Sequence, residues 1–259
     1  MVSSLQSAPQ RTAIVTGAGS GIGAAVAAQF GALGWRVALG GRRLERLEQT
    51  AQAITETGGE AWSHPLDVAD GRSILEFFDA HEAHFGVADV LVNNAGMNTP
   101  GPLHEVAGVD IDREVATNLT GPIHMVRRAL VPLLEEKKRG DLVFISSDAA
   151  RHPRPRQAVY TATKLGLEGL SRTLAMELEG TGIRTTIVRP GSTLSEYASS
   201  WDFEKIPALV EYWQGFGLQR HGGVMTAETV ARAVVLAVTT EPGVVLDVIE
   251  VQPEAPGPS

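Results

Sequence analysis

Cysteine is missing from this chain of 259 residues, and its absence excludes several kinds of site at once. A chain without thiols has no disulfide, no thiolate metal ligand and no cysteine nucleophile. Positive charge is scarce as well, because 22 lysines and arginines stand against 30 acidic residues and leave a formal net charge of −8. This balance argues against a general binder of nucleic acid or of another polyanion.

Long apolar runs are also absent. The first residues, MVSSLQSAPQR, contain neither the basic stretch nor the apolar stretch of a secretory signal. No apolar segment reaches the length that crosses a bilayer. We therefore expect a cytoplasmic protein that binds neither membrane nor nucleic acid. Its flexible ends are expected at residues 1–10 and at the proline-rich residues 252–259.

What the chain does contain is a regular alternation of short apolar segments with helical patterns. The expected strands are 12–16, 35–40, 61–68, 88–96 (which runs into a polar turn), 141–147, 183–191 and 244–251. The expected helices are 24–34, 44–59, 71–86, 111–137, 157–179 and 226–239. Short apolar strands separated by helices are typical of a parallel sheet covered on both faces. The pattern therefore predicts a single-domain, Rossmann-like, doubly wound α/β fold of about seven strands over residues 11–251.

Residues 192–225 interrupt this alternation and hold much of the chain's aromatic content. The aromatic residues here are Tyr197, Trp201, Phe203, Tyr212, Trp213 and Phe216. Loops at the carboxyl end of such a sheet line its ligand crevice, so we interpret this insertion as a lid over a small apolar ligand. A packed pair of surface helices or an oligomer contact is the alternative.

The sequence TGAGSGIG at residues 16–23 follows the first expected strand and opens the first expected helix. The free N–H groups and the positive dipole end of a helix N-terminus suit a phosphate, and glycines let the backbone approach it. This predicts a cofactor-phosphate site formed by Gly17, Gly19, Ser20, Gly21, Ile22 and Gly23. A tight turn that binds no ligand is the alternative.

The ends of the second and third strands bear on which cofactor is bound. A carboxylate usually binds the ribose 2′-hydroxyl of NAD(H) at the first of these corners, but residues 40–41 are glycines and Arg42 and Arg43 follow. A 2′-phosphate pairs well with a guanidinium, so NADP(H) is favoured over NAD(H). The alternative is that both arginines are a solvated helix start. Asp67, which precedes Val68, is placed to accept a hydrogen bond from adenine or, alternatively, to cap the next helix.

Tyr160 and Lys164 are four residues apart in an expected helix and therefore share one face. An ammonium close to a phenol favours the phenolate, which lets a tyrosine act as general acid or base near neutral pH. Ser147 ends the preceding strand, where its hydroxyl is placed to donate to a substrate oxygen. Taken alone, the tyrosine and lysine are equally compatible with a surface pair.

The whole set of motifs resembles the short-chain dehydrogenase/reductase family over nearly the full chain. The resemblance rests on TGAGSGIG at 16–23, NNAG at 93–96, Asn118, the serine–tyrosine–lysine set with its spacing of thirteen from serine to tyrosine, and PG at 190–191. It implies that Tyr160 donates or accepts the proton. Ser147 is then expected to orient the substrate oxygen, Lys164 to bind the nicotinamide ribose and tune Tyr160, and Asn118 to hold a water in a proton relay.

The same resemblance implies further cofactor contacts and an assembly. The expected contacts, besides the glycine loop, the two arginines, Asp67 and Val68, are Asn94, Ala95, Gly96, Tyr160, Lys164, Pro190, Gly191, Thr193 and Ser195. The family more often has threonine where Ser195 stands. Family members are usually dimers or tetramers, so a homotetramer or homodimer is expected, built from the helices at 111–137 and 157–179 with the last strand and helix.

One part of the proton relay is expected on physical grounds as well. Pro122 lies four residues after Asn118 in an expected helix. Proline has no N–H, so the carbonyl of residue 118 loses its helical partner. A freed carbonyl that points inward is suited to hold an ordered water.

Two basic clusters are not assigned to catalysis. His81 and His84 are interpreted as a solvated helix face, and no metal site is expected. The connection after Ser147 contains Arg151, His152, Arg154 and Arg156. These residues are expected to be solvated or to pair with acids of a neighbouring subunit. The alternative is that they attract an anionic substrate.

These observations predict an NADP(H)-dependent oxidoreductase that moves hydride between nicotinamide and a carbonyl or secondary alcohol, with Tyr160 as general acid and base. An NAD-dependent sugar, polyol or steroid alcohol dehydrogenase is the nearest alternative. The alternative from another class of protein is a non-catalytic NADP(H)-binding regulator, because a protein can keep the fold of an enzyme family without its catalytic activity.

Overall fold

The computed structural model describes residues 10–194, 201, 206–218 and 221–256. Its centre is a seven-stranded sheet with the order β3-β2-β1-β4-β5-β6-β7, in which every neighbouring pair is parallel. The strands are β1 (Thr12–Thr16), β2 (Arg36–Gly41), β3 (Glu60–Pro65), β4 (Val90–Asn93), β5 (Gly140–Ile145), β6 (Ile183–Pro190) and β7 (Val248–Val251). The predicted doubly wound parallel sheet is confirmed.

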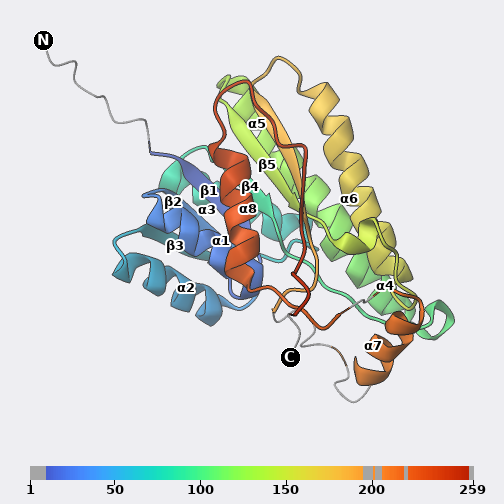
Figure 1. The fold of residues 1–259 in the computed structure, drawn as a ribbon. Helices are drawn as coiled ribbons and strands as arrows, with labels where there is room; N and C mark the ends of the chain where they lie inside the picture. Colours follow the sequence, from blue (N-terminus) through green and yellow to red (C-terminus); the bar gives the residue numbers. More distant parts are fainter. Residues whose placement is uncertain (1–9, 195–200, 202–205, 219–220, 257–259) are drawn as a thin grey trace, which may run out of the picture.

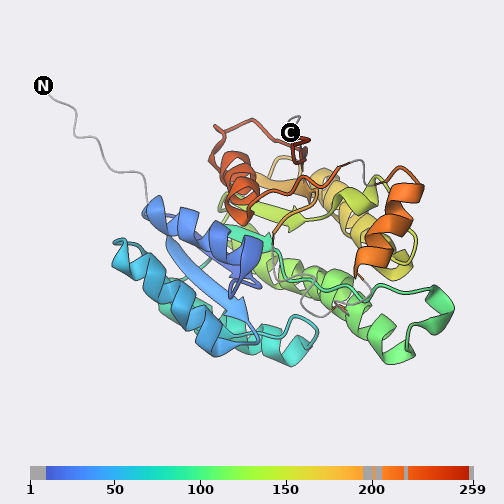
Figure 2. The ribbon, with the colours of Figure 1, turned by 60° about the horizontal axis from the view of Figure 1, so that its bottom comes forward.

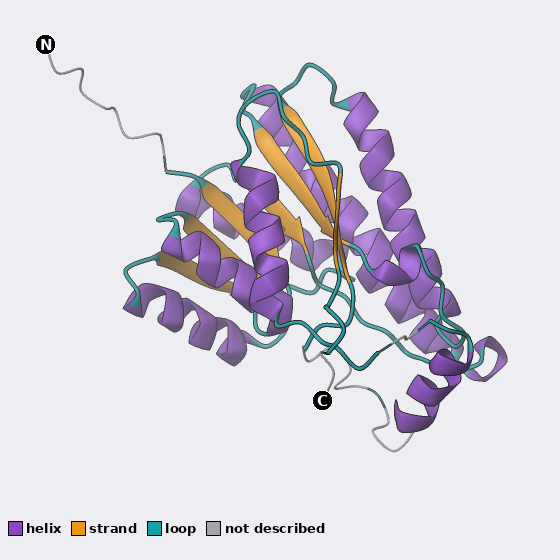
Figure 3. Ribbon diagram, in the orientation of Figure 1, coloured by secondary structure: helices purple, strands orange, loops and turns teal. Residues whose placement is uncertain are grey.

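Helices cover both faces of this sheet (Figures 1 and 3). One core joins the sheet to α1 (Gly21–Ala32), α2 (Leu44–Glu56) and α8 (Ala227–Thr239). The other core joins it to α3 (Gly71–Phe85), α5 (Gly121–Glu135) and α6 (Ala158–Glu177). Figure 2 shows the sheet between the α1–α8 pair and α5. Strands buried on both sides explain why β1, β4 and β5 are apolar almost throughout.

The helix expected at 111–137 is divided. Helix α4 (Gly108–Val115) runs into a π-helical turn, η2 (Ala116–Thr120), before α5 begins. Pro122 lies in the first turn of α5, and because it lacks an N–H it cannot continue the α-helical hydrogen bonds. The π-helical turn at Ala116–Thr120 agrees with the expected loss of the α-helical partner of the Asn118 carbonyl, while the water at that carbonyl stays a prediction. Single π-helical turns of this kind are frequent at functional sites.

Most strands end or begin a few residues away from the prediction, and the reason is clearest for β7 and β3. β7 starts at Val248 instead of residue 244. Gly243 adopts a φ of +90°, and Val244 belongs to the turn, because its N–H donates to the carbonyl of Glu241 at 3.2 Å and its carbonyl accepts from Arg184 at 2.7 Å. β3 ends at Pro65 instead of residue 68, since the Asp67 carboxylate accepts the N–H of Ala69 at 3.0 Å and closes a local turn. Both differences arise from turns at strand ends, which apolar periodicity does not report.

The remaining helical segments are short and lie in the loops. They are η1 (Leu103–Glu105), η3 (Asp148–Ala150) and α7 (Ile206–Gly215). No described helix is long and apolar enough to cross a membrane. The chain order reverses between β1 and β4, and in open α/β sheets this is where a crevice forms at the carboxyl ends of the strands.

Candidate active site

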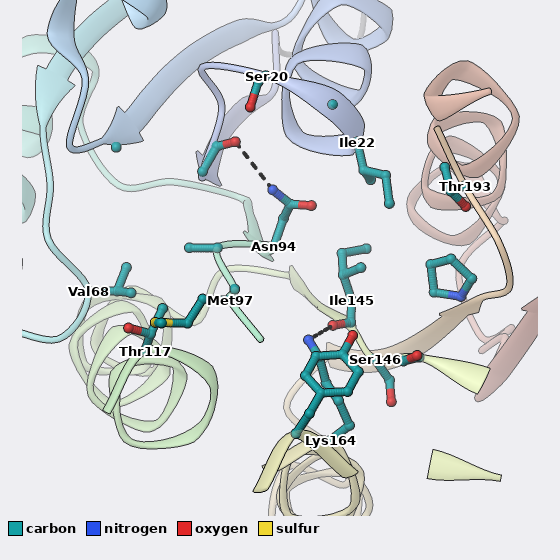
Figure 4. Close-up of a pocket in the computed structure, with 18 of the residues that line it drawn as sticks. Ser20, Ile22, Val68, Asn94, Met97, Thr117, Ile145, Ser146, Lys164 and Thr193 are labelled. Carbon is teal, nitrogen blue, oxygen red and sulfur yellow. Dashed lines mark hydrogen bonds between the residues drawn. The ribbon is translucent and has the colours of Figure 1, made fainter. Parts of the chain in front are cut away.

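A cavity of about 650 Å³ lies along the carboxyl ends of the strands (Figure 4). It brings together predicted residues that lie far apart in the sequence. Those that line it are Gly17, Gly19, Ser20, Gly21, Ile22, Arg42, Arg43, Asp67, Val68, Asn94, Ala95, Gly96, Ser147, Tyr160, Lys164, Pro190, Gly191 and Thr193. Gly23 and Asn118 lie behind this lining, and Ser195 lies outside the described residues.

The glycine loop forms one side of the cavity, with Ser20 and Ile22 across from Lys164 (Figure 4). Gly17 and Gly21 have φ values of +67° and +53°, a conformation that favours glycine. A Cβ on Gly23 would collide with the carbonyl oxygen of Gly17, so only glycine lets α1 begin this close to the loop.

Asn94 fixes this loop from the end of β4. Its side-chain amide donates to the carbonyl of Thr16 at 2.8 Å and to that of Gly17 at 3.4 Å. The Thr16 hydroxyl in return accepts the backbone N–H groups of Asn94 and Ala95, both at 3.0 Å. The TGAGSGIG loop and the NNAG turn, which are separate motifs in the sequence, therefore form one hydrogen-bonded unit.

The N-terminus of α1 fits a phosphate group. Ser20 is the N-cap, and within the described part of the chain its side chain caps no N–H of the helix. The first helical N–H groups are therefore available to an anion at the positive end of the helix dipole. The cradle of glycines without side chains provides the space, so these residues fit the pyrophosphate of a dinucleotide.

The corner after β2 is basic, as predicted. Arg42 and Arg43 are both exposed and line the cavity, and no carboxylate occupies residues 40–41. Arg43 donates to the hydroxyl of Ser20 at 3.2 Å, which brings the corner up to the glycine loop. At the end of β3, Asp67 is not the N-cap of α3. The N-cap is Asp70, whose carboxylate accepts the N–H of Arg72 at 2.9 Å.

The opposite end of the cavity holds Ser147, Tyr160 and Lys164, which are 8%, 7% and 4% exposed. Lys164 donates to the carbonyl of Ile145 at 2.7 Å (Figure 4). The Nζ atom of Lys164 lies 5.5 Å from the centre of the Tyr160 ring. Burial lowers the pKa of Lys164 to about 8. The predicted cluster of hydroxyl, phenol and amine is thus assembled from β5's carboxyl end and one face of α6.

Asn118 supports this cluster from behind. Its side chain exchanges two hydrogen bonds with the backbone of Met97, each of 2.8 Å, and donates to the Thr163 hydroxyl at 3.2 Å. Thr163 in turn donates to the carbonyl of Tyr160 at 2.7 Å. Because these contacts occupy the side-chain amide, the backbone carbonyl is the group of Asn118 that is suited to a relay.

In the basic connection after Ser147, residues Arg151, His152 and Arg156 are exposed as expected, whereas Arg154 pairs within the chain, which corrects the prediction for that residue. Arg154 donates to both carboxylate oxygens of Asp148, at 2.8 and 2.6 Å, and the two side chains are only 12% and 11% exposed. Arg151 pairs with Glu250 at 2.9 Å. Both acids come from this chain. Asp148 lies six residues before Arg154, whereas Glu250 lies on β7, far along the sequence, where no local pattern points to it.

The aromatic insertion contributes two tryptophans to the cavity. Trp201 and Trp213 both line it, with ring centres 6.3 Å apart. Their indole N–H groups donate elsewhere, to the carbonyls of Asn98 at 3.1 Å and Pro155 at 2.8 Å. Both rings are therefore satisfied and offer apolar surface. Tyr197 and Phe203 lie outside the described residues, and the lid stays a prediction.

His81 contradicts the expected solvated face. It is completely buried against Trp62, Phe77 and Phe85, while His84 is exposed. Burial, aided by nearby positive groups, lowers the pKa of His81 to about 4 and keeps the ring neutral. In the described residues no group of three or more histidine or acidic side chains is arranged to bind a metal.

Glu114 is a buried acid that the sequence analysis missed. It is 1% exposed, one oxygen accepts the N–H of Thr99 at 2.9 Å, and the other has no hydrogen-bond partner among the described residues. Burial raises its pKa to about 7, against the opposing effects of Thr99 and the charge of Lys164. Its position four residues before Asn118, on the same helix face, was the available signal.

The free energy of unfolding is expected to depend on pH through Glu114. The pKa of the Glu114 carboxyl is higher in the folded state than in the unfolded state. The stability that the protonated acid gives the fold is therefore complete below about pH 4.5 and is lost as the pH rises through about 7. Relative to Glu114→Gln, which still accepts from Thr99, the wild type should lose roughly 2–3 kcal/mol between about pH 5 and pH 8. Urea denaturation at both pH values measures this difference. The exposed Asp112→Asn is the control, and a gap independent of pH contradicts the prediction.

Comparison with known proteins decides the family. The short chain dehydrogenase family profile matches residues 11–205. The 3beta-hydroxysteroid dehydrogenase 1 of Eggerthella lenta is 37% identical over 183 residues, 70% of each chain. This chain belongs to the short-chain dehydrogenase/reductase family.

Solved structures of this family agree with the fold. A metagenomic short-chain oxidoreductase in complex with NADP has a TM-score of 0.79 and 33% identity, covering 94% of this chain and 97% of that one. A 3-ketoacyl-(acyl-carrier-protein) reductase from Brucella melitensis, complexed with NADH, has a TM-score of 0.80 and 25% identity, covering 93% and 96%. The protein is therefore a family oxidoreductase that acts on CH–OH or C=O groups with a nicotinamide cofactor.

Proposed function

We propose that this protein is an NADP(H)-dependent oxidoreductase that moves hydride between nicotinamide and a carbonyl or secondary alcohol, with Tyr160 as general acid and base. The observation that carries the proposal is the layout of the cavity. An anion-binding glycine loop with two arginines forms one end, and a buried serine, tyrosine and lysine form the other.

The preference for NADP(H) is supported by charge. Arg42 and Arg43 line the cavity at the corner after β2, and Arg43 contacts Ser20 of the glycine loop, where the pyrophosphate would be held. A guanidinium binds phosphate through paired, charge-assisted hydrogen bonds, and a carboxylate that would repel it is missing from residues 40–41. Several family members of known structure, such as the metagenomic oxidoreductase, are complexed with NADP, but the Brucella reductase is complexed with NADH.

The chain's own residues supply a proton and hold the substrate. When bound, the nicotinamide supplies or accepts the hydride. During carbonyl reduction Tyr160 gives its phenolic proton to the substrate oxygen while Ser147 donates a hydrogen bond to the same atom. Lys164 lies beneath the ring and stabilises the phenolate that is left. The carbonyl of Asn118 provides the next acceptor for the water through which the proton is replaced.

The assembly and the location remain predictions. Helices α5 and α6 expose apolar side chains that a neighbouring subunit would cover, which supports a homodimer or homotetramer. They are Ile123, Val131 and Leu134 on α5, and Leu165 and Met176 on α6. A cytoplasmic location is proposed from the composition alone.

The experiment that tests the proposal is NADPH consumption over a panel of ketones and aldehydes, with NADP⁺ reduction over the matching alcohols. We expect turnover with at least one pair and faster turnover with NADPH than with NADH. Tight NADPH binding with no turnover of any compound supports the regulator instead. Turnover that is faster with NADH supports the NAD-dependent dehydrogenase.

A further inference from the structure

The ion pair between Asp148 and Arg154 lies directly beside Ser147. The Ser147 hydroxyl accepts the N–H of Ala149 at 3.1 Å and donates to Oδ1 of Asp148 at 3.3 Å. That same Oδ1 accepts from Arg154 at 2.8 Å, while Oδ2 accepts from Arg154 at 2.6 Å. One carboxylate therefore receives the serine proton and both arms of a guanidinium.

The pair forms part of the cavity wall at the substrate end. Both side chains line the cavity although each is about nine-tenths buried. Trp213 packs against the guanidinium, with 5.8 Å between the ring centre and the Cζ atom of Arg154. Because the two charges cancel, this wall has no net charge, which argues against the alternative that Arg154 attracts an anionic substrate.

Without the arginine, Asp148 would oppose the reaction in two ways. A bare carboxylate is a strong acceptor and would compete with the substrate for the single proton of the Ser147 hydroxyl. Its negative charge would also lie close to the oxygen on which negative charge develops as hydride arrives. In a partly buried site this repulsion is only weakly screened.

We propose that Arg154 is a positioning residue, which neutralises Asp148 and so lets the Ser147 hydroxyl turn from Asp148 to the substrate oxygen. This inference rests on the proposed function, in which Ser147 contacts that oxygen. Arg154 acts through Asp148 and Ser147, with no contact of its own to the reacting atoms. The role is specific to charge, which separates it from a structural contribution of the pair to the loop.

Charge-changing variants test the proposal because removing the arginine and removing the carboxylate are expected to have different effects on kcat. Arg154→Met leaves the carboxylate uncovered and should lower kcat about tenfold to a hundredfold, with KM for a neutral ketone changed less than about threefold. Asp148→Asn removes the negative charge and should keep kcat within about threefold of wild type. The double variant Asp148→Asn/Arg154→Met should recover to about the level of Asp148→Asn.

Two further variants serve as controls. Arg151→Met removes a neighbouring arginine that is 58% exposed and pairs with Glu250 away from the cavity, so kcat should not change. Arg154→Lys keeps the charge and should retain most of the activity, which covers the case that Arg154→Met does not fold. NADPH affinity, measured by fluorescence titration, should be the same in every variant because the pair lies at the substrate end.

The outcome that overturns the proposal is equal loss of kcat in Arg154→Met, Asp148→Asn and the double variant, as a purely structural pair would give. An Arg154→Met enzyme as active as Arg151→Met overturns it as well. Failure of the proposed function is a separate result. In that case the wild type is inactive on every carbonyl, or Tyr160→Phe keeps full activity, whatever the Arg154 variants do.

Discussion

Replacing Tyr160 by phenylalanine should lower kcat for carbonyl reduction about 100- to 10,000-fold, the usual contribution of a positioned general acid. The phenylalanine ring keeps the packing of this 7% exposed side chain and its contact with Lys164, but it has no proton to give. Steady-state rates of NADPH oxidation measure the loss. NADPH affinity should stay within about threefold of wild type, because only the hydroxyl is removed.

The matched control is Tyr212→Phe. Tyr212 lies on α7, is 41% exposed and contacts Arg156 and Phe216 away from the reacting groups. The same chemical change there should leave kcat unaltered. If Tyr160→Phe keeps wild-type kcat, the assignment of the proton donor is wrong. If it loses NADPH binding together with activity, the hydroxyl serves the cofactor site rather than the proton transfer.

Replacing Arg42 and Arg43 together by serine should remove the preference for NADPH. Each charge-assisted hydrogen bond to a phosphate contributes about 1.5–3 kcal/mol, so the Kd for NADPH should rise about tenfold to several hundredfold. Affinity for NADH should change little, because its ribose carries no phosphate. The ratio of kcat/KM values for NADPH and NADH measures the switch.

A distant arginine provides the control for that experiment. Arg72 on α3 is almost fully exposed and pairs with Glu76, so Arg72→Ser removes a surface charge without touching the cavity. It should leave the cofactor ratio unchanged. A double variant at 42 and 43 that keeps the wild-type ratio means that the 2′-phosphate is bound elsewhere or is not recognised.

The fold could be predicted from the sequence because the patterns that indicate it are local. Continuously apolar strands, helical periodicity and glycines at a strand-to-helix turn each report on a few neighbouring residues. Pro122 is a local signal of the same kind, because its missing N–H removes the α-helical partner of the Asn118 carbonyl, where the structure has a π-helical turn. The glycine loop, the NNAG turn and the predicted face of α6 all line the cavity, and each is marked by a local motif in the sequence.

The errors concern partners that meet only in three dimensions. The sequence pattern suggests that His81 is a surface residue of a helix. In the structure its face of α3 packs against Trp62 of β3 and is buried from solvent. Arg154 was expected to be solvated or to pair with another subunit, and it pairs with Asp148 because the loop after η3 folds back on itself. Glu114 went unnoticed because an acid on a helix is normally solvated, and only the segment at Thr99 buries it.

The central claim is that hydride passes between nicotinamide and a carbonyl carbon at the end of the cavity where Tyr160 and Lys164 meet. The most direct measurement uses NADPH with deuterium at the transferable C4 position, incubated with the wild type and the most active carbonyl compound of the panel. Deuterium at the carbinol carbon of the product, with almost no product from Tyr160→Phe, is the predicted result. Bound NADPH that labels no alcohol from any carbonyl compound would contradict the account.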